Sequence, residues 1–282
     1  MTGMVKQTIS SEFRNVDSTQ SSDHLVQYLE YADSLPETRQ IKVNSYGYLG
    51  LKKGDVVLDA GCGPGYDALR MAAIVGRSGK VTGIDLSERM IAIAQEKTNG
   101  SDLPVSFRKG DIRKLDVVDA TFDAVRVERM LQILDHPGQI LDELVRVLRP
   151  GGKLVAIEPD WEMFVVDPGS RDTARKFFRF CANQFPDGST GRKLYRYLKE
   201  RTMQNVTVHP EPLILHDFAL ASKLMNMEPF LAAAEEQGVL ARDEIVAWQR
   251  ELKEADTEGR FTFVGMMFAV EGRKGESDLN LP

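Results

Sequence analysis

From residue 55 to residue 159 the sequence alternates short runs of apolar residues with longer stretches in which apolar residues recur at helical spacing. The short runs are continuously apolar, which is typical of strands buried on both faces of a parallel sheet. The predicted strands are 56–58, 80–84, 105–107, 122–127 and 154–157, and the predicted helices between them are 67–75, 87–97 and 137–148. This alternation of predicted strands and helices predicts an α/β fold with a doubly wound, mostly parallel sheet.

The rest of the chain adds helices and strands to this pattern. Two helices are predicted before the sheet, at 24–35 and 37–51, with Pro36 dividing them. After Pro159 the pattern loosens and predicts helices at 172–185, 191–201 and 218–253 and strands at 205–208 and 261–270, which complete a seven-stranded sheet. We expect an N-terminal helical cover at 1–51, one domain at 52–272 with helical insertions at about 161–201 and 216–256, and a flexible tail at 273–282.

The composition argues against several classes of protein. The 282 residues include 36 Lys and Arg against 42 Asp and Glu, a formal net charge of −6, which disfavours a nucleic-acid partner. The two cysteines, Cys62 and Cys181, are too few for a disulfide scaffold and indicate a reducing compartment. No run of about 18 apolar residues appears, so we expect no membrane span and a cytoplasmic protein. No His, Cys and carboxylate cluster has the spacing of a zinc site, so no metal is expected.

A glycine-rich turn follows the first predicted strand, in the sequence Asp59-Ala60-Gly61-Cys62-Gly63-Pro64-Gly65-Tyr66. Glycines there allow backbone angles that other residues avoid, and they let a ligand approach the main chain. The turn lies at the carboxyl end of a parallel strand, where open α/β sheets bind their ligands. The dinucleotide motif requires a third glycine where this chain has Tyr66, which disfavours a nicotinamide or flavin cofactor.

Four separated motifs lie at the ends of successive predicted strands. They are Val57-Leu58-Asp59-Ala60-Gly61-Cys62-Gly63-Pro64-Gly65, Gly83-Ile84-Asp85-Leu86-Ser87 with Met90, Gly110-Asp111-Ile112, and Phe122-Asp123-Ala124-Val125 followed by Val147-Leu148-Arg149-Pro150-Gly151-Gly152-Lys153-Leu154. In this order they resemble the motifs of class I S-adenosylmethionine-dependent methyltransferases, specifically the type 11 or ubiquinone/menaquinone-methyltransferase-like group that acts on small molecules. The resemblance implies a Rossmann-like methyltransferase fold, S-adenosyl-L-methionine as cofactor and S-adenosyl-L-homocysteine as product.

Residues of these motifs are predicted to hold the cofactor. Asp85 ends the second strand, where a carboxylate can accept both ribose hydroxyls, and Ser87 is the better candidate for the helix N-cap. Asp111 can accept the adenine amino group, or it is a plain turn carboxylate. The resemblance implies that Asp59 and Glu128 lie near the amino acid end of the cofactor. The full predicted set is Asp59, Gly61, Gly63, Gly65, Asp85, Leu86, Met90, Gly110, Asp111, Ile112 and Glu128.

Methyl transfer from a sulfonium is an in-line displacement, so positioning and desolvation can supply much of its rate. A general base is needed only when the acceptor must lose a proton, and its candidates are His136, Glu158 and Asp160. His136 comes just before a predicted helix near the end of the fourth strand, where it is either a base or a loop histidine at the helix start. Glu158 and Asp160 follow the fifth strand, where they either orient or deprotonate an acceptor or serve as structural or solvated carboxylates.

The acceptor pocket is expected from the parts outside the core. In the family that the motifs resemble, an N-terminal helical segment and an insertion after the fifth strand commonly cover the cofactor and shape this pocket. The candidate pocket residues are Tyr28, Tyr31, Arg129, Trp161 and Phe178. The aromatic residues can equally belong to the core, and Arg129 either anchors an anionic acceptor or pairs with a carboxylate.

The leading hypothesis is therefore methyl transfer from S-adenosyl-L-methionine to carbon, nitrogen or oxygen of an organic small molecule. The alternatives are a protein or tRNA methyltransferase, of which the tRNA version is disfavoured by the acidic charge balance, and a non-catalytic cofactor-binding scaffold. A homodimer could form through the N-terminal helices or through the 261–270 strand.

Overall fold

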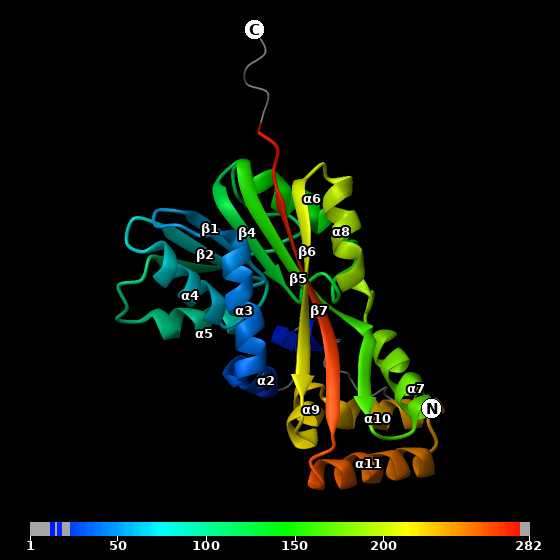
Figure 1. Cartoon of the computed structure of the whole chain (residues 1–282). Helices are drawn as coiled ribbons and strands as arrows, with labels where there is room; N and C mark the ends of the chain where they lie inside the picture. Colours follow the sequence, from blue (N-terminus) through cyan, green and yellow to red (C-terminus); the bar gives the residue numbers. More distant parts are fainter. Residues whose placement is uncertain (1–11, 15, 19–22, 277–282) are drawn as a thin grey trace.

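The computed structural model describes residues 12–14, 16–18 and 23–276. Its centre is a seven-stranded sheet in the order β3-β2-β1-β4-β5-β7-β6 (Figure 1). The strands are β1 (Val56–Ala60), β2 (Lys80–Asp85), β3 (Val105–Lys109), β4 (Phe122–Glu128), β5 (Leu148–Asp167), β6 (Gln204–Leu215) and β7 (Thr262–Arg273). The predicted α/β class and seven-stranded, mostly parallel sheet are confirmed.

The strand directions divide the sheet into a parallel and an antiparallel part. β3, β2, β1, β4 and β5 run parallel to one another. β7 runs antiparallel to both of its neighbours, β5 and β6. The strand order reverses between β1 and β4, and such a reversal opens a crevice at the carboxyl ends of the strands. The glycine turn after β1 therefore lies where a ligand is expected.

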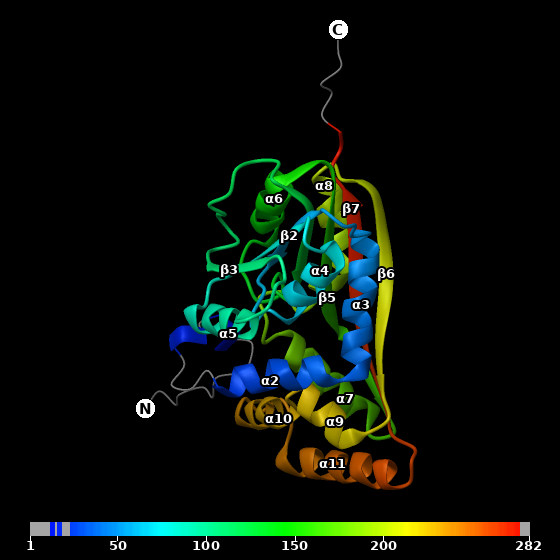
Figure 2. The same ribbon diagram turned by 90° about the vertical axis from the view of Figure 1, so that its left-hand side faces the viewer.

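Consecutive residues of the central strands enter two different cores, which explains the continuously apolar runs. Val57 and Val155 pack into the core that includes α3, α4 and α5, whereas Leu58 and Leu154 pack into the core that includes α6 and α8. Helices therefore cover both faces of the parallel strands (Figure 2). These helices are α3 (Pro36–Leu49), α4 (Tyr66–Val75), α5 (Glu88–Thr98), α6 (Pro137–Val147) and α8 (Thr190–Glu200).

The two predicted N-terminal helices are confirmed as α2 (Asp23–Ser34) and α3. Pro36 occupies the first turn of α3, where its missing N–H costs no helical hydrogen bond. Gly50 ends α3 in the left-handed conformation, with φ of 64°, and its N–H bonds back to the carbonyl of Tyr46. Proline and glycine thus set the two ends of this helix.

β5 is much longer than predicted and corrects the proposed boundary of the first insertion. The strand has 20 residues and continues to Asp167, so residues 161–167 form strand where a helical insertion was expected to begin. Its pairing with β7 is irregular between Asp160 and Val165. Such an irregularity interrupts the alternation from which a strand is predicted, and the continuation of β5 was missed for this reason.

β6 is also longer than predicted, covering 204–215 instead of 205–208. The added part contains Pro210 and Pro212, and proline cannot donate to a sheet hydrogen bond. β6 is, however, the edge strand of the sheet, and proline is tolerated in an edge strand when its nitrogen faces solvent.

The long helical zone predicted at 218–253 is three helices, α9 (Phe218–Leu224), α10 (Met227–Glu236) and α11 (Arg242–Thr257). The chain adopts positive φ at Asn226 and Gly238, which separates them. Together with α2 and α7 (Arg171–Ala182) they gather around one end of β5, β6 and β7 (Figure 2). None of the helices formed by the described residues is long and apolar enough to cross a membrane.

The position of β7 corrects one of the two proposed dimer contacts. β7 lies between β5 and β6 and is hydrogen-bonded to both. It therefore has no free edge with which to pair with a second copy, and a dimer formed through the edge of the 261–270 strand is wrong. A contact through the N-terminal helices stays a prediction.

Gly65 determines how closely the glycine turn packs on the neighbouring elements. It precedes α4 with φ of 82°, a conformation that favours glycine. A Cβ atom at this position would lie 2.6 Å from Cζ of Phe107 in β3 and 2.9 Å from Cβ of Ala94 in α5. Both neighbours are buried, so neither can easily move away.

Replacing Gly65 with alanine is expected to destabilise the protein by about 3 kcal/mol, through backbone strain combined with overpacking. Gly100→Ala is the matched control, because Gly100 has φ of 77° and no atom within 4 Å of an added Cβ. Its expected loss is only about 1 kcal/mol. Urea denaturation measures both values, and equal losses would show that the contact with Phe107 is unimportant.

Candidate active site

A cavity of about 270 Å³ lies at the carboxyl ends of the parallel strands, where the ligand was predicted. The loops after β1, β2, β3 and β4 form one wall. The opposite wall comes from Phe13, from α2 and from residues of β5, β6 and β7. The cavity therefore joins the motif loops to the parts of the chain that were predicted to shape an acceptor pocket.

Nearly all predicted cofactor residues line this cavity. They are Asp59, Gly61, Gly63, Asp85, Leu86, Met90, Gly110, Asp111, Ile112 and Glu128. Gly65 is not among the lining residues, and its contacts with Phe107 and Ala94 give it a packing role instead. The motif residues thus converge on one site, as expected for strand ends that meet at one edge of a sheet.

Asp85 connects the glycine turn to the start of α5. Its Oδ2 accepts a hydrogen bond of 2.9 Å from the backbone N–H of Gly63, and its Oδ1 accepts one of 2.9 Å from the N–H of Ser87. Burial raises the pKa of Asp85, and these backbone bonds oppose the rise. Ser87 caps α5 as predicted, because its Oγ accepts a bond from the N–H of Met90.

Asp111 lies at the rim of the cavity in an ion pair with Arg113. Nη2 of Arg113 lies 2.7 Å from Oδ2 of Asp111, and the backbone N–H of Arg113 donates to Oδ1. These hydrogen bonds lower the pKa of Asp111. Its carboxylate is therefore available as an acceptor at neutral pH.

The segment η1 (Val16–Ser18) docks on the same helix end as Asp85. Oδ1 of Asp17 accepts a hydrogen bond of 2.5 Å from Oγ of Ser87, and its Oδ2 accepts one of 2.8 Å from the N–H of Glu88. Val16 and Asp17 both line the cavity. The described part of the N-terminal segment thus covers the cavity beside α5.

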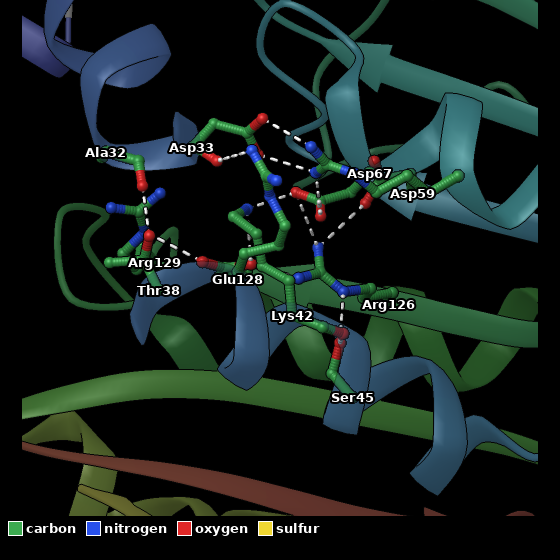
Figure 3. Close-up of polar contacts among 12 residues, drawn as sticks. Ala32, Asp33, Thr38, Lys42, Ser45, Asp59, Asp67, Arg126, Glu128 and Arg129 are labelled. Atoms are coloured by element: carbon green, nitrogen blue, oxygen red, sulfur yellow. Dashed lines mark hydrogen bonds and ion pairs between the residues drawn. The ribbon is translucent and has the colours of Figure 1, made fainter. Parts of the chain in front are cut away.

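A buried network of charged side chains forms another wall of the cavity (Figure 3). Arg126 of β4, whose exposed fraction is only 2%, lies 3.6 Å from Asp59 and 3.5 Å from Asp67 and hydrogen-bonds Glu128. Lys42 of α3 lies 2.5 Å from Asp67 and 3.2 Å from Glu128. The guanidinium and the ammonium therefore share three carboxylates from three elements.

Opposite charges balance within the network. Lys42, Arg70, Arg126 and Arg129 supply four positive charges, and Asp33, Asp59, Asp67 and Glu128 supply four negative charges when all are ionised. Burial alone raises the pKa of Glu128, but Lys42 and Arg126 outweigh it and lower that pKa to about 2. Glu128 is therefore ionised at neutral pH.

Asp59 differs from its acidic neighbours. Burial raises its pKa to about 7, with Asp67 adding to the rise and Arg126 opposing it. Its Oδ2 is buried and has no hydrogen-bond partner among the described residues. A buried carboxylate oxygen without a partner carries a desolvation cost that a cationic ligand can remove, so this atom fits the ammonium group of an amino acid.

The network was missed from the sequence apart from Asp59, Glu128 and Arg129. Arg126 offered one local signal, because it interrupts the otherwise apolar run of β4. A charged residue inside a strand buried on both faces requires partners. Lys42 and Asp67 offered no comparable signal, since each lies on a helix with mixed composition.

The second part of the cavity is apolar and aromatic. Its lining residues include Trp161, Phe164, Phe185, Leu213, Met225 and Met267. Trp161 stacks on Phe185 with ring centroids 4.7 Å apart, and its indole N–H donates to Oε1 of Gln132 at 2.8 Å. This part can enclose an apolar molecule beside the polar motif loops.

Three of the five predicted pocket residues line the cavity, namely Tyr28, Arg129 and Trp161. The hydroxyl of Tyr28 donates to the carbonyl of Leu224 and so joins α2 to α9. Tyr31 is not a lining residue and instead packs under the ammonium of Lys223. Phe178 is buried in the aromatic core against Phe164, so these two residues do not form the cavity wall.

The three predicted general bases are not brought to the cavity. His136 is exposed and precedes α6. Glu158 is fully buried and accepts a hydrogen bond of 2.7 Å from the N–H of Leu131. Asp160 is also fully buried and pairs with Arg192. Burial raises the pKa of Glu158 to about 8. The two carboxyl groups therefore support neighbouring backbone and helix α8 instead of facing an acceptor.

Comparison with known proteins agrees with this geometry. Residues 57–152 match the profile of a methyltransferase domain. Relatives include an uncharacterized 37.1 kDa protein in transposon TN4556 of Streptomyces fradiae, 34% identical over 76% of this chain and 62% of that protein. Another is a demethylmenaquinone methyltransferase of Listeria welshimeri, 33% identical over 55% of this chain and 65% of that protein. The chain thus spans less than two thirds of the length of these relatives.

A solved structure shows the same fold. The phosphoethanolamine N-methyltransferase 2 of Haemonchus contortus, in complex with S-adenosyl-L-methionine, superposes with a TM-score of 0.60 at 18% identity, covering 94% of this chain and 60% of that one. With the sheet order, this shows the Rossmann-like fold that is typical of class I S-adenosylmethionine-dependent methyltransferases, and within it residues 57–152 match a methyltransferase domain.

Removing Arg126 is expected to destabilise the protein strongly. Arg126→Met leaves Asp67 and Glu128 buried beside one cation fewer, and breaking a buried ion pair in this way costs about 3–5 kcal/mol. Arg113→Met is the matched control, because Arg113 is half exposed and its pair with Asp111 lies at the surface; the expected loss is below about 1 kcal/mol. Denaturant unfolding at pH 7.5 measures both, and similar losses would contradict the role given to Arg126.

Proposed function

We propose that this chain binds S-adenosyl-L-methionine in the cavity and transfers its methyl group to an organic small molecule. The observation that carries the proposal is the division of one cavity into a polar part, built by the motif loops and the charged network, and an adjoining aromatic part. The match of residues 57–152 to a methyltransferase domain supports it. The demethylmenaquinone methyltransferases among the relatives favour a small-molecule acceptor over a protein or tRNA.

In this proposal each motif loop holds one portion of the cofactor. Asp85 accepts the ribose hydroxyls, and Asp111 accepts the adenine amino group with Ile112 beside the ring. Leu86 and Met90 supply apolar surface to the adenosine portion. Asp59 and Glu128 face the ammonium of the amino acid portion, where the unpartnered Oδ2 of Asp59 supports the assignment.

The chemistry required of the protein is mainly alignment. The bound cofactor supplies a methyl group already activated by its sulfonium. The aromatic residues around Trp161 hold the acceptor and exclude water from it, which supports an in-line displacement. Because His136, Glu158 and Asp160 lie away from the cavity lining, we propose no protein base for the reaction.

The first test is cofactor binding. Isothermal titration of the full chain with S-adenosyl-L-homocysteine should show one site, and Asp85→Ala should weaken it about 5- to 150-fold by removing hydrogen bonds of a charged acceptor. Asp102→Ala is the matched control, because that carboxylate is exposed on the surface, and its affinity should equal that of the unmodified chain. Melting curves confirm that both variants fold.

The result that overturns the cofactor assignment is absence of binding by the folded, unmodified chain. If binding is present, incubation with radiolabelled S-adenosyl-L-methionine and separated small-molecule and macromolecular extracts tests transfer. Label in the small-molecule fraction supports the proposal. Label only in protein or RNA, or no transfer at all, would replace it with one of the alternatives named from the sequence.

Because of Asp59, the affinity for the cofactor is expected to depend on pH. A cationic ammonium beside Asp59 favours the ionised carboxylate, so the pKa of Asp59 should be lower in the complex than its value of about 7 in the free protein. Below that pH, binding must release a proton, and the affinity should fall by up to about tenfold per pH unit. Above it, the affinity should be constant.

Titration with S-adenosyl-L-homocysteine between pH 5.5 and 8.5 measures this dependence. Asp59→Asn is the control, because an asparagine keeps the shape and cannot ionise, and its affinity should be weaker and independent of pH. A slope that persists in Asp59→Asn would assign the proton to another group.

A further inference from the structure

Gln132 is a polar residue in the wall of the cavity whose side chain the chemistry proposed so far does not use. It lies in the loop after β4, lines the cavity and has an exposed fraction of only 4%. Its Oε1 accepts the hydrogen bond of 2.8 Å from the indole N–H of Trp161. It therefore stands where the loop after β4 meets the aromatic part.

This single contact fixes the direction of the amide group. An indole nitrogen can only donate a hydrogen bond, so the amide atom that faces it must be the oxygen. The nitrogen Nε2, with its two N–H donors, is then turned away from Trp161. No group of the described residues accepts a hydrogen bond from Nε2. Nε2 is also not one of their fully buried polar atoms without a partner, so it keeps some exposed surface. Its donors are thus free for a molecule in the cavity.

The part of the loop just before Gln132 is held by two hydrogen bonds to β5. The carboxyl group of Glu158 accepts the backbone N–H of Leu131 at 2.7 Å, and the carbonyl of Ile157 accepts the N–H of Arg129 at 2.9 Å. Such support keeps a side chain in one orientation and lowers the entropy lost when it binds a ligand.

Trp161 is equally well fixed. Its backbone N–H donates to the carbonyl of Gly188 at 2.9 Å, and its ring stacks on Phe185 and lies 5.0 Å from that of Phe164. The amide oxygen of Gln132 therefore has a stationary partner. Phe164 and Phe185 also line the cavity. Their rings near the amide of Gln132 offer no hydrogen bonds to a bound methyl acceptor.

We propose that Gln132 is a specificity-determining residue, whose Nε2 donates a hydrogen bond to a carbonyl or hydroxyl oxygen on an otherwise apolar ring-containing acceptor. The inference rests on the proposed function, since it assigns the acceptor class of the same cavity. A neutral donor in apolar surroundings selects for such an oxygen, because an acceptor without it leaves the donor unpaired after water is displaced. The hydrogen bond also fixes the orientation of the ring in the cavity.

Two compounds that differ by one oxygen test this role without turnover. 1-Tetralone carries a ring carbonyl, and tetralin is the same bicyclic skeleton without it. Each is titrated into the full chain saturated with S-adenosyl-L-homocysteine, with tryptophan fluorescence as the readout, since Trp161 is one of only two tryptophans and lines the cavity. We expect 1-tetralone to bind about three- to tenfold more tightly than tetralin.

Two variants separate the donor from the rest of the side chain. Gln132→Glu keeps an oxygen for the indole of Trp161 and, as an ionised carboxylate, has no hydrogen-bond donor. Gln132→Met keeps the length and removes all hydrogen bonding. In both variants the affinities for 1-tetralone and tetralin should become nearly equal. The affinity for S-adenosyl-L-homocysteine in both variants, and the affinity for tetralin in Gln132→Met, should stay within about twofold of the values of the unmodified chain. Melting curves report folding.

An unchanged preference for 1-tetralone in either folded variant overturns the proposal, as does equal binding of the two compounds by the unmodified chain or binding of neither up to the solubility limit. These outcomes are distinct from a failure of the proposed function. A chain that binds S-adenosyl-L-homocysteine but shows no preference keeps the cofactor assignment and loses only the role of Gln132. A chain that does not bind S-adenosyl-L-homocysteine loses the proposed function first.

Discussion

The buried guanidinium of Arg126 is the interaction on which the arrangement of the site depends. It brings carboxylates from β1, α4 and β4 together beneath α3. Without it these carboxylates would repel one another in a buried setting, which is costly when charges are not paired. Arg126 also donates a hydrogen bond to Oγ of Ser45 in α3, so three elements of the cavity wall and one N-terminal helix are joined through a single buried cation.

The central strands were predictable because each buries consecutive residues on both faces, and this leaves a continuous apolar run in the sequence. The long ends of β5 and β6 were not, since an irregular pairing and two edge prolines conceal the strand pattern. The motif residues were also predictable, because a strand end and its following loop are local in sequence. Lys42 and Gln132 were not, because their partners lie 25 to 86 residues away and only the fold brings them together.

The cavity combines two environments that favour different parts of a reaction. Fixed charges and backbone donors suit a polar, charged cofactor, whereas the rings around Trp161 suit an apolar acceptor and keep water out. The absence of the predicted bases from the cavity lining fits a reaction whose barrier is lowered chiefly by alignment. Gln132 belongs to both environments, as a polar side chain oriented by an aromatic one.

The two prolines of β6 have a consequence beyond the length of that strand. An exposed sheet edge normally offers a row of N–H donors on which a foreign strand can assemble, the first step of many aggregation reactions. Pro210 and Pro212 remove donors from this row. The long antiparallel pair of β6 and β7, which contributes to the far wall of the cavity, can therefore form the edge of the sheet without becoming a template for fibre growth along β6.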